Sequence, residues 1–275
     1  MASCSNNSSM ANLVDIEDIG FPNQSIDKTI EVNTHNSKVV FSKKTIEYVK
    51  DLHHQFKTGI NFNKLMISLR KKHHYNPNKT QMSAAYQYIL NNDPSVCAEE
   101  PNEALLEHIK AKEMRGLSGV IVISVITAPY PEYTDSDGKK KTQRFSCRHD
   151  CHYCPRELNA DGKEVNARSY LSDEPTVARG LRLKYNPIDQ YNDRAMQYQR
   201  NGHYVDKIEI IVLGGTWTEY PREYQETFIR DIFYAANIFY EKEKEKDRPK
   251  YSLQKEQKIN ETGKSRIIGL TLEMR

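Results

Sequence analysis

The stretch VIVISVIT, residues 120–127, decides the fold that the sequence predicts. It is a near-continuous run of β-branched and apolar residues, which is typical of a strand buried on both faces of a parallel sheet. Two further runs of this kind follow, KIEIIVL at 207–213 and IIGLTL at 267–272. The segments between these runs, 175–200 and 221–240, have helical periodicity. The order β-α-β-α-β predicts an α/β fold.

The rest of the chain is predicted to fall into three ranges. Residues 1–37 are rich in Ser and Asn and lack sustained periodicity, which predicts a disordered tail. Residues 38–93 predict a small helical domain, and residues 94–275 predict the α/β domain. Three helices are expected in the helical domain. Their apolar residues recur at helical spacing, as in Ile46, Val49, Leu52 and Phe56, and Asn61 is the expected N-cap of the second helix. The EKEKEK run within 241–258 predicts a solvated extension or insertion without chemistry.

Charge is distributed unevenly along the chain. The whole sequence has 40 Lys and Arg against 37 Asp and Glu, a net charge of +3. Residues 38–93 contain ten basic and three acidic residues, a net charge of +7. Arg70, Lys71 and Lys72 lie together in this range, near Tyr75, which suits a phosphate backbone beside a stacking surface. The alternative is an ordinary solvated helix face.

Membrane insertion and secretion are not predicted. The longest apolar run, 119–128, has about half the length that a membrane-spanning helix needs, and the N-terminus has no signal-peptide pattern. An intracellular, cytoplasmic protein is therefore expected. The chain has five cysteines, an odd number for a disulfide scaffold, and three of them crowd into one short segment.

That segment is FSCRHDCHYCPRE, residues 145–157, in which Cys147, Cys151 and Cys154 are separated by three and then two residues. Three thiolates on one loop can ligate three irons of a [4Fe–4S] cluster and leave the fourth iron open to a substrate or cofactor. A zinc site is the alternative, in which His149 or His152 would complete the usual set of four ligands.

The position of the cysteine loop favours the cluster. The loop follows the first predicted strand, and reactive groups in α/β barrels lie at the C-terminal ends of strands. Gly214, Gly215 and Thr216 occupy the same position after the second strand. Glycines at this place let a ligand approach the backbone closely, so this edge of the sheet is the predicted site.

These motifs belong to a longer pattern. It comprises KEMRGLSGVIVISVITAP (112–129), CHYCP (151–155), SYLSDEPTVARGLRLKYNP (169–187), GHYVDKIEIIVLGGT (202–216) and IGLTLEMR (268–275). Together these segments resemble the catalytic subunit family of Elongator, across roughly residues 60–275. That family joins a radical S-adenosylmethionine (SAM) barrel to an acetyltransferase-like domain. The resemblance implies a partial (β/α) radical-SAM barrel, of which this chain has the first half, preceded by a small helical domain.

The resemblance also implies a function. Family members are transferases that convert the wobble uridine of tRNA to 5-carboxymethyluridine with SAM and acetyl-CoA. The implied cofactors are therefore a [4Fe–4S] cluster, SAM and acetyl-CoA, and the implied partners are tRNA and Elongator-type subunits.

Several residues take their expected roles from this family. Cys147, Cys151 and Cys154 correspond to the cluster ligands, and Gly214, Gly215 and Thr216 to a SAM-binding turn. Lys207 corresponds to a lysine associated with acetyl-CoA; otherwise it is a solvent-exposed lysine at a strand edge. The region of Arg70, Lys71 and Lys72 corresponds to the tRNA-binding part. Four residues of the most similar segment could either pack the barrel mouth or touch substrate: Tyr170, Glu174, Arg182 and Tyr185.

The family chain continues beyond the point that corresponds to Arg275. Three interpretations follow: part of a working Elongator-type enzyme, whose missing half a second chain could supply; a non-catalytic remnant that binds a cluster and RNA; or a zinc-dependent RNA-binding module. We expect the chain alone to bind a cluster without carboxymethylating tRNA.

Overall fold

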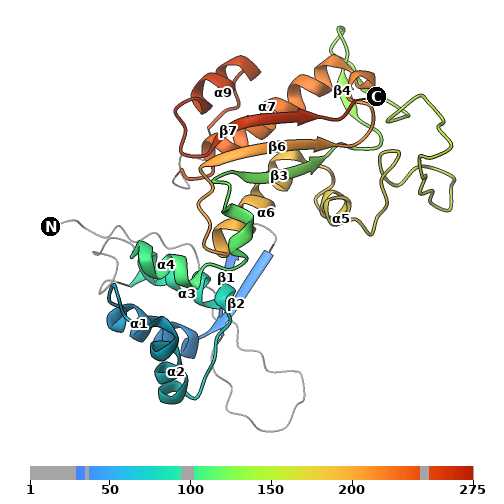
Figure 1. The fold of residues 1–275 in the computed structure, drawn as a ribbon. Helices are drawn as coiled ribbons and strands as arrows, with labels where there is room; N and C mark the ends of the chain where they lie inside the picture. Colours follow the sequence, from blue (N-terminus) through green and yellow to red (C-terminus); the bar gives the residue numbers. More distant parts are fainter. Residues whose placement is uncertain (1–28, 35–36, 94–101, 242–247, 275) are drawn as a thin grey trace. The chain divides into compact units, whose positions relative to one another are not determined.

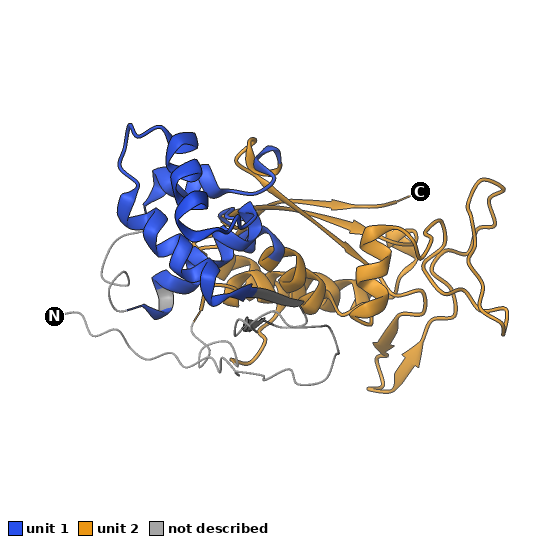
Figure 2. Ribbon diagram, turned by 90° about the horizontal axis from the view of Figure 1, so that it is seen from below, with its two compact units in different colours: residues 1–114, 197–204 blue, residues 115–196, 205–275 orange. Residues whose placement is uncertain are grey.

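The computed structural model describes residues 29–34, 37–93, 102–241 and 248–274. The chain forms two compact units (Figure 2). Unit 1 runs through Met114 and includes Gln197–Tyr204, and unit 2 contains Arg115–Met196 and Val205–Arg275.

Unit 1 is mainly helical (Figure 1). Its elements are β1 (Thr29–Thr34), β2 (Ser37–Ser42), α1 (Lys43–Gln55), α2 (Phe62–His73), α3 (Lys79–Asn92) and α4 (Glu103–Ile109). The three helices expected within 38–93 are confirmed as α1 to α3. The strand β1, which pairs with β2 in antiparallel fashion, differs from the disordered tail expected over 1–37. The remainder of that range, apart from Ser37, lies outside the described residues.

Side-chain caps begin the helices of unit 1. Asn61 accepts a hydrogen bond from Lys64 N (3.1 Å), which confirms the expected N-cap of α2. Ser42 caps α1 in the same way, and Asn78 caps α3 within a reciprocal capping box with Gln81. Each cap satisfies a backbone N–H that has no partner inside its helix, which stabilises the helix by about 1 kcal/mol.

The apolar faces of these helices meet in one core. Its fully buried members include Tyr48, Leu52, Tyr86 and Leu105, one or two from each of α1, α3 and α4. Burying a large apolar side chain contributes about 1.5–3 kcal/mol, so this shared core holds the short helices together.

Unit 2 contains a parallel three-stranded sheet in the order β3-β6-β7. The strands are β3 (Ile121–Ile126), β6 (Lys207–Leu213) and β7 (Arg266–Leu272), which confirms the predicted α/β fold. The helices are α5 (Pro175–Arg182), α6 (Pro187–Arg200), α7 (Arg222–Ile238) and α9 (Leu253–Asn260). The end of α6, from Gln197, belongs to unit 1. Two short 3-10 helices, η1 (Glu113–Gly116) and η2 (Trp217–Glu219), and a small hairpin of β4 (Glu132–Thr134) and β5 (Lys140–Thr142) complete the described elements. Within the described ranges the sheet is open, so a barrel stays a prediction.

The two outer strands of the sheet have different edges. On β3, the Gln190 side chain accepts from Ile126 N (2.9 Å) and donates to Ile126 O (3.0 Å), and Arg179 donates to Ser124 O (2.6 Å). On β7, Asn260 accepts from Ile267 N (2.8 Å) at the start of the strand. No described strand pairs with β7 on the side away from β6.

Where the structure describes it, the segment 241–258 predicted as a solvated extension packs against α7. Glu256 of α9 is fully buried and receives two hydrogen bonds from Arg248 (2.8 and 2.7 Å). Asn237 of α7 also donates to the Glu256 carboxylate (2.8 Å). These contacts fasten α9 to α7. Residues 242–247 lie outside the described part of the chain.

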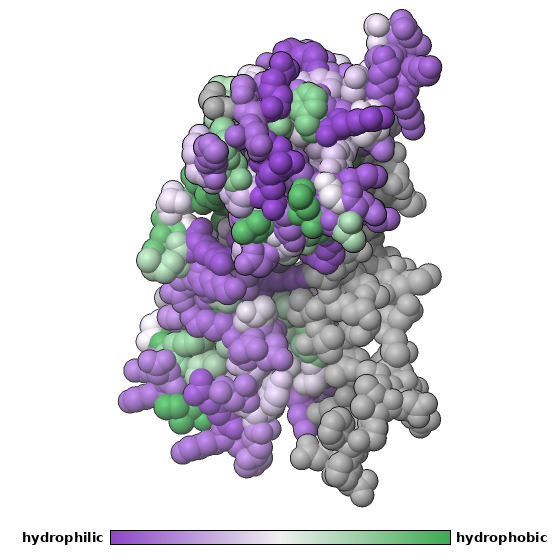
Figure 3. All heavy atoms as spheres, turned by 90° about the vertical axis from the view of Figure 1, so that its right-hand side faces the viewer, coloured by the Kyte–Doolittle hydropathy of each residue, from purple (hydrophilic) through white to green (hydrophobic). Residues whose placement is uncertain are grey.

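Among the residues that the structure describes, no helix has the length and apolar character to span a membrane. Figure 3 shows one face of the molecule coloured by hydropathy. Where its residues are described, this face is mostly hydrophilic, with hydrophobic residues scattered over it.

Candidate functional site

The candidate site lies where β3 and β6 end. The β4–β5 hairpin follows β3 and leads into the cysteine loop, and Gly214 and Gly215 follow β6 directly. A Cβ atom on Gly215 would lie 2.0 Å from the carbonyl oxygen of Ser146, the residue before Cys147. The two motifs that the sequence placed at one edge of the sheet are therefore in direct contact.

Gly214 also requires the absence of a side chain. Its φ is +137°, and a Cβ atom there would lie 1.9 Å from Thr127 Oγ1 at the end of β3. The glycine pair thus packs against protein atoms of the strand end and the cysteine loop. A role in ligand approach, as the sequence predicted, would have to involve the groups of Gly214 and Gly215 that these contacts leave free.

Thr216 links the glycine turn to the cysteines. Its hydroxyl donates to the sulfur of Cys147 over 3.3 Å. This hydrogen bond connects the predicted SAM-binding turn to one of the predicted cluster ligands.

All three cysteines of the loop are free thiols, and each is half-buried. Cys154 N donates to Cys151 O (3.1 Å), so the two-residue spacing closes a tight turn. Three soft sulfur donors on one accessible loop suit the chemistry of an iron–sulfur cluster. In the described residues, no three His, Cys, Asp or Glu side chains converge as ligands of one ion. The three sulfur donors thus suit a cluster by their chemistry. Since they do not converge in this arrangement, the loop would have to bring the three sulfurs closer together to hold one.

The alternative zinc ligands are not directed inward. His149 and His152 are both exposed, and neither belongs to a converged ligand group in the described part of the chain.

Arg168 fastens the cysteine loop, a role that the sequence analysis missed. Arg168 N donates to Ser146 Oγ (2.9 Å), and its guanidinium pairs with Glu164 (2.9 Å) and donates to the carbonyl of His149. Both side chains of the Arg168–Glu164 pair are largely buried, at 12% and 9% exposure. An isolated arginine in a polar loop has no spacing pattern, so sequence inspection could not have found this role.

Two tyrosines form hydrogen bonds at the ends of the strands beside the site. The Tyr220 hydroxyl accepts from Gly215 N (2.8 Å) and shares a hydrogen bond with Thr127 Oγ1 (2.7 Å), joining the ends of β3 and β6. Burial raises the pKa of Tyr220 to about 12, so the phenol stays protonated. Tyr170 donates to Glu273 at the end of β7, and burial together with that carboxylate raises the Tyr170 pKa above its usual range.

The other residues singled out in the segment 169–187 have partners within the protein. Tyr185 donates to Val165 O (2.9 Å), and Arg182 pairs with Asp193 (3.0 Å). Glu174 accepts from Leu171 N (3.0 Å). These three side chains hold the loop and helices in place.

Lys207 lies at the opposite end of the sheet from the cysteines. It is the first residue of β6, exposed, and in register with Arg266 of β7. Since each strand residue advances about 3.3 Å, the seven residues of β6 separate Lys207 from the glycine turn by roughly 20 Å.

The predicted RNA-contacting residues belong to unit 1. Arg70 and Lys71 are exposed near the end of α2, whereas Lys72 pairs with Asp51 of α1 (2.5 Å). That pair partly neutralises one of the three charges.

Sequence comparisons identify relatives of the chain. The tRNA uridine(34) acetyltransferase of Methanocaldococcus infernus is 34% identical over 178 residues, 64% of this chain and 29% of the relative. Elongator complex protein 3 of Homo sapiens is 31% identical over 211 residues, 72% of this chain and 34% of the relative. This chain is a homologue of Elongator complex protein 3. The Dictyostelium discoideum Elongator complex protein 3 is 29% identical across 87% of this chain and 39% of its own length.

The chain spans about a third of the length of these curated relatives. No family model matches it. A solved structure of an N-terminally shortened Elp3 from Methanocaldococcus infernus is 27% identical, covers 57% of this chain and 23% of that one, and has a TM-score of 0.35. That superposition is too loose to bear on the fold.

Proposed function

We propose that this chain contains the cluster-binding and RNA-binding parts of a radical-SAM enzyme that modifies the wobble uridine of tRNA in the cytoplasm. The observation that carries the proposal is the packing of the three-cysteine loop against Gly215 and Thr216 at the C-terminal edge of the parallel sheet. Relatives named tRNA uridine(34) acetyltransferase and Elongator complex protein 3 support the substrate class. The reaction we propose is 5-carboxymethylation, with acetyl-CoA as carbon donor.

In this proposal Cys147, Cys151 and Cys154 are the ligands of a [4Fe–4S] cluster. The cluster would supply the electron for the reductive cleavage of SAM. The protein's own part is positional. Gly215 lets the loop approach the sheet, and Thr216 donates to the Cys147 sulfur.

The turn of Gly214, Gly215 and Thr216 would bind SAM. Arg168 and Tyr220 would keep the loop and the turn in register during that binding, because each holds backbone atoms of these segments by hydrogen bonds.

Lys207 is proposed to contact acetyl-CoA. It is exposed, and its distance from the cysteine loop means that it would bind a part of acetyl-CoA remote from the reacting carbon. Elongator-type subunits are proposed as partners in the assembled enzyme, as the names of the relatives suggest.

Anaerobic reconstitution with iron and sulfide tests the proposal. We expect about four irons and four sulfides per chain, with cluster absorbance lost in Cys147→Ala, Cys151→Ala and Cys154→Ala. Cys4→Ala and Cys97→Ala are the matched controls and should load fully. Tightly bound zinc without cluster absorbance would overturn the proposal in favour of a zinc module.

A Gly215→Ala variant connects the cluster to the packing of the site. A methyl group cannot fit 2.0 Å from the Ser146 carbonyl oxygen, so the loop must shift. We expect cluster loading to fall to less than about half that of the unaltered chain. Gly263→Ala is the control, since neither glycine has a positive φ and a Cβ atom on Gly263 would meet its nearest neighbour at 3.4 Å, an ordinary contact distance. Equal loading in the two variants would show that the glycine turn does not position the cysteines.

A further inference from the structure

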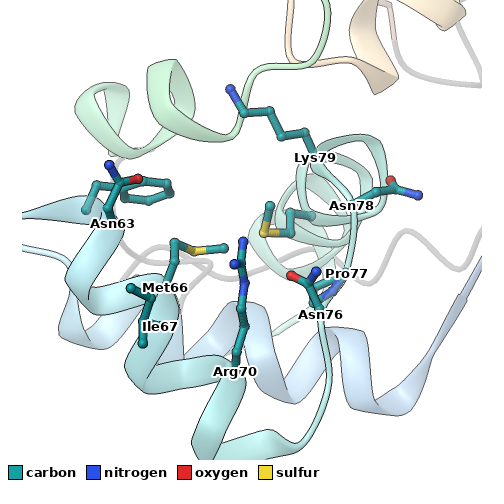
Figure 4. Close-up of a pocket in the computed structure, with 10 residues that line it drawn as sticks. Asn63, Met66, Ile67, Arg70, Asn76, Pro77, Asn78 and Lys79 are labelled. Atoms are coloured by element: carbon teal, nitrogen blue, oxygen red, sulfur yellow. The ribbon is translucent and has the colours of Figure 1, made fainter.

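A pocket opens on unit 1 between α2 and the start of α3 (Figure 4). Its volume is about 520 Å³, within the usual range of small-molecule pockets, roughly 300–1,000 Å³. The lining residues come from α2, the loop after it and the first turn of α3.

The floor of the pocket is apolar. Met66 is 5% exposed and Met82 is 3% exposed, so their thioethers form a fixed surface. Ile67, at 51% exposure, stands at the side of this floor with its apolar surface in water. Thioethers and flat apolar surfaces make favourable contacts with aromatic rings.

The rim of the pocket is cationic and amidic. Arg70 extends into the space between α2 and the loop after it, and Lys79 stands at the opposite rim (Figure 4). No lining residue is acidic. Asn63 and Asn76 are exposed there and can present amides to a ligand. The positive charges of Arg70 and Lys79 favour an anionic group on the ligand. The apolar floor favours a flat apolar group on the same ligand.

The two cations differ in their present contacts. Lys79 pairs with Glu113 (2.5 Å), and both side chains are about half exposed. An exposed ion pair contributes little to stability, so a phosphate can replace Glu113 at small cost. Arg70 lies near the hydroxyl of the buried Tyr48 and pairs with no described carboxylate.

A nucleotide combines these properties, because it carries a flat base next to an anionic phosphate. In a duplex the bases are stacked and paired, and their faces cannot reach such a floor. In single-stranded loops the bases can be splayed out, stacked on side chains and read by amides. The surrounding net charge of +7 over residues 38–93 favours a polyanion over a free nucleotide.

We propose that the pocket between α2 and α3 binds one unstacked nucleotide of an RNA loop, with the base over Met66 and Met82 and the adjoining phosphate on Arg70 and Lys79. This inference rests on the proposed tRNA-modifying function. Beyond that function, the inference states that the chain prefers unpaired RNA and that the pocket between α2 and α3 is the site of this preference.

The test compares two RNAs with equal numbers of phosphates, a hairpin with an unpaired loop and a blunt duplex. Binding of the full chain is measured by fluorescence anisotropy at one salt concentration. Arg70→Gln removes a charge inside the pocket, and Lys64→Gln removes the same charge from the same helix outside it. Circular dichroism confirms folding of each variant.

Lys64→Gln should weaken both RNAs alike, by about twofold. Arg70→Gln should weaken the hairpin about tenfold and the duplex only about twofold, because one stacked and charge-held nucleotide is lost. Ile67→Ser, which changes no charge, should weaken the hairpin about threefold and leave the duplex unchanged.

Equal losses for the two RNAs in Arg70→Gln, or full hairpin affinity in Ile67→Ser, would overturn the pocket proposal while leaving tRNA binding by the unaltered chain intact. If the unaltered chain binds neither RNA, the proposed function fails as well. A 4-thiouridine in the hairpin loop should crosslink to Met66, Ile67 or Met82, and crosslinks confined to other elements would also overturn the pocket proposal.

Discussion

The two outer strands of the parallel sheet end the sheet in different ways. At β3, the side-chain amide of Gln190 accepts a hydrogen bond from Ile126 N and donates one to Ile126 O. It thereby pairs the same backbone groups that a neighbouring strand would pair. At β7, Asn260 contacts the first residues, and no described strand follows. An unpaired strand edge can accept another strand. Side chains therefore cover the edge of this sheet at β3, whereas the edge at β7 is left available for another strand.

Breaking the closed edge should have the largest effect on stability. Gln190→Leu fills a similar volume but leaves the buried N–H and C=O of Ile126 without these partners, and each such group costs about 1–3 kcal/mol. We expect the free energy of unfolding to fall by about 3 kcal/mol, measured by urea denaturation.

The matched control for the closed edge is Gln254→Leu on the exposed surface of α9. Its expected change is less than about 0.5 kcal/mol. A loss in Gln190→Leu as small as in this control would mean that water replaces the glutamine and that the β3 edge is not closed by it.

The stabilisation that the Glu256 carboxylate gives to α9, the helix that precedes β7, should depend on pH. Burial alone would raise the pKa of Glu256, but hydrogen bonds from Arg248, Tyr251 N and Asn237 hold it below its usual value of 4.5. A carboxyl whose folded pKa is lowered stabilises the fold above the unfolded pKa, and this stabilisation is lost as pH falls through the folded pKa. Glu256→Gln should therefore cost about 2 kcal/mol at neutral pH and progressively less below about pH 4.5.

Glu261→Gln provides the comparison for this pH dependence, because the Glu261 side chain is 59% exposed and pairs with Lys258 at the surface. Thermal unfolding from pH 7 to pH 3 measures both variants. A constant difference between Glu256→Gln and the unaltered chain across this range would show that the carboxylate charge is not what fastens α9.

The smallest effect concerns self-association. We expect the chain to associate through β7, where Ile268 is 56% exposed. Ile268→Lys places a charge on that strand and should raise the dissociation constant of the associated species about tenfold. Val122→Lys makes the same change on β3, at a side chain that is 38% exposed, and should change it less than about twofold. Sedimentation velocity over a concentration series measures both, and equal effects would remove the distinction between the edges.

Much of unit 2 was predictable because its signals are local. The β-branched run at 120–127 and the later apolar runs specify strands by composition, and their alternation with helical segments specifies parallel pairing. The contact between the cysteine loop and the glycine turn followed from the same rule. The cluster, SAM, acetyl-CoA and tRNA roles of the named residues stay predictions.

The side-chain contacts that close and fasten the structure were not predictable. Gln190 and Ile126 are 64 residues apart in the chain, and no periodicity links a polar side chain to a distant backbone group. Glu256 lies in a charged segment whose sequence is typical of a solvated helix. In the structure, Arg248 and Asn237 donate hydrogen bonds to its carboxylate. The strand β1 was hidden by the average polarity of residues 1–37, which outweighs a short strand within it.

The three free thiols of the cysteine loop also limit how long the chain can be handled in air. Half-exposed thiols oxidise to sulfenic acid and then to disulfides. Cys151 and Cys154 already share a tight turn, and any disulfide in this loop would leave one thiolate where a cluster needs three. Metal-binding capacity should therefore decline with the hours of aerobic purification and return on reduction, so preparations of different age are comparable only after their free thiols have been counted.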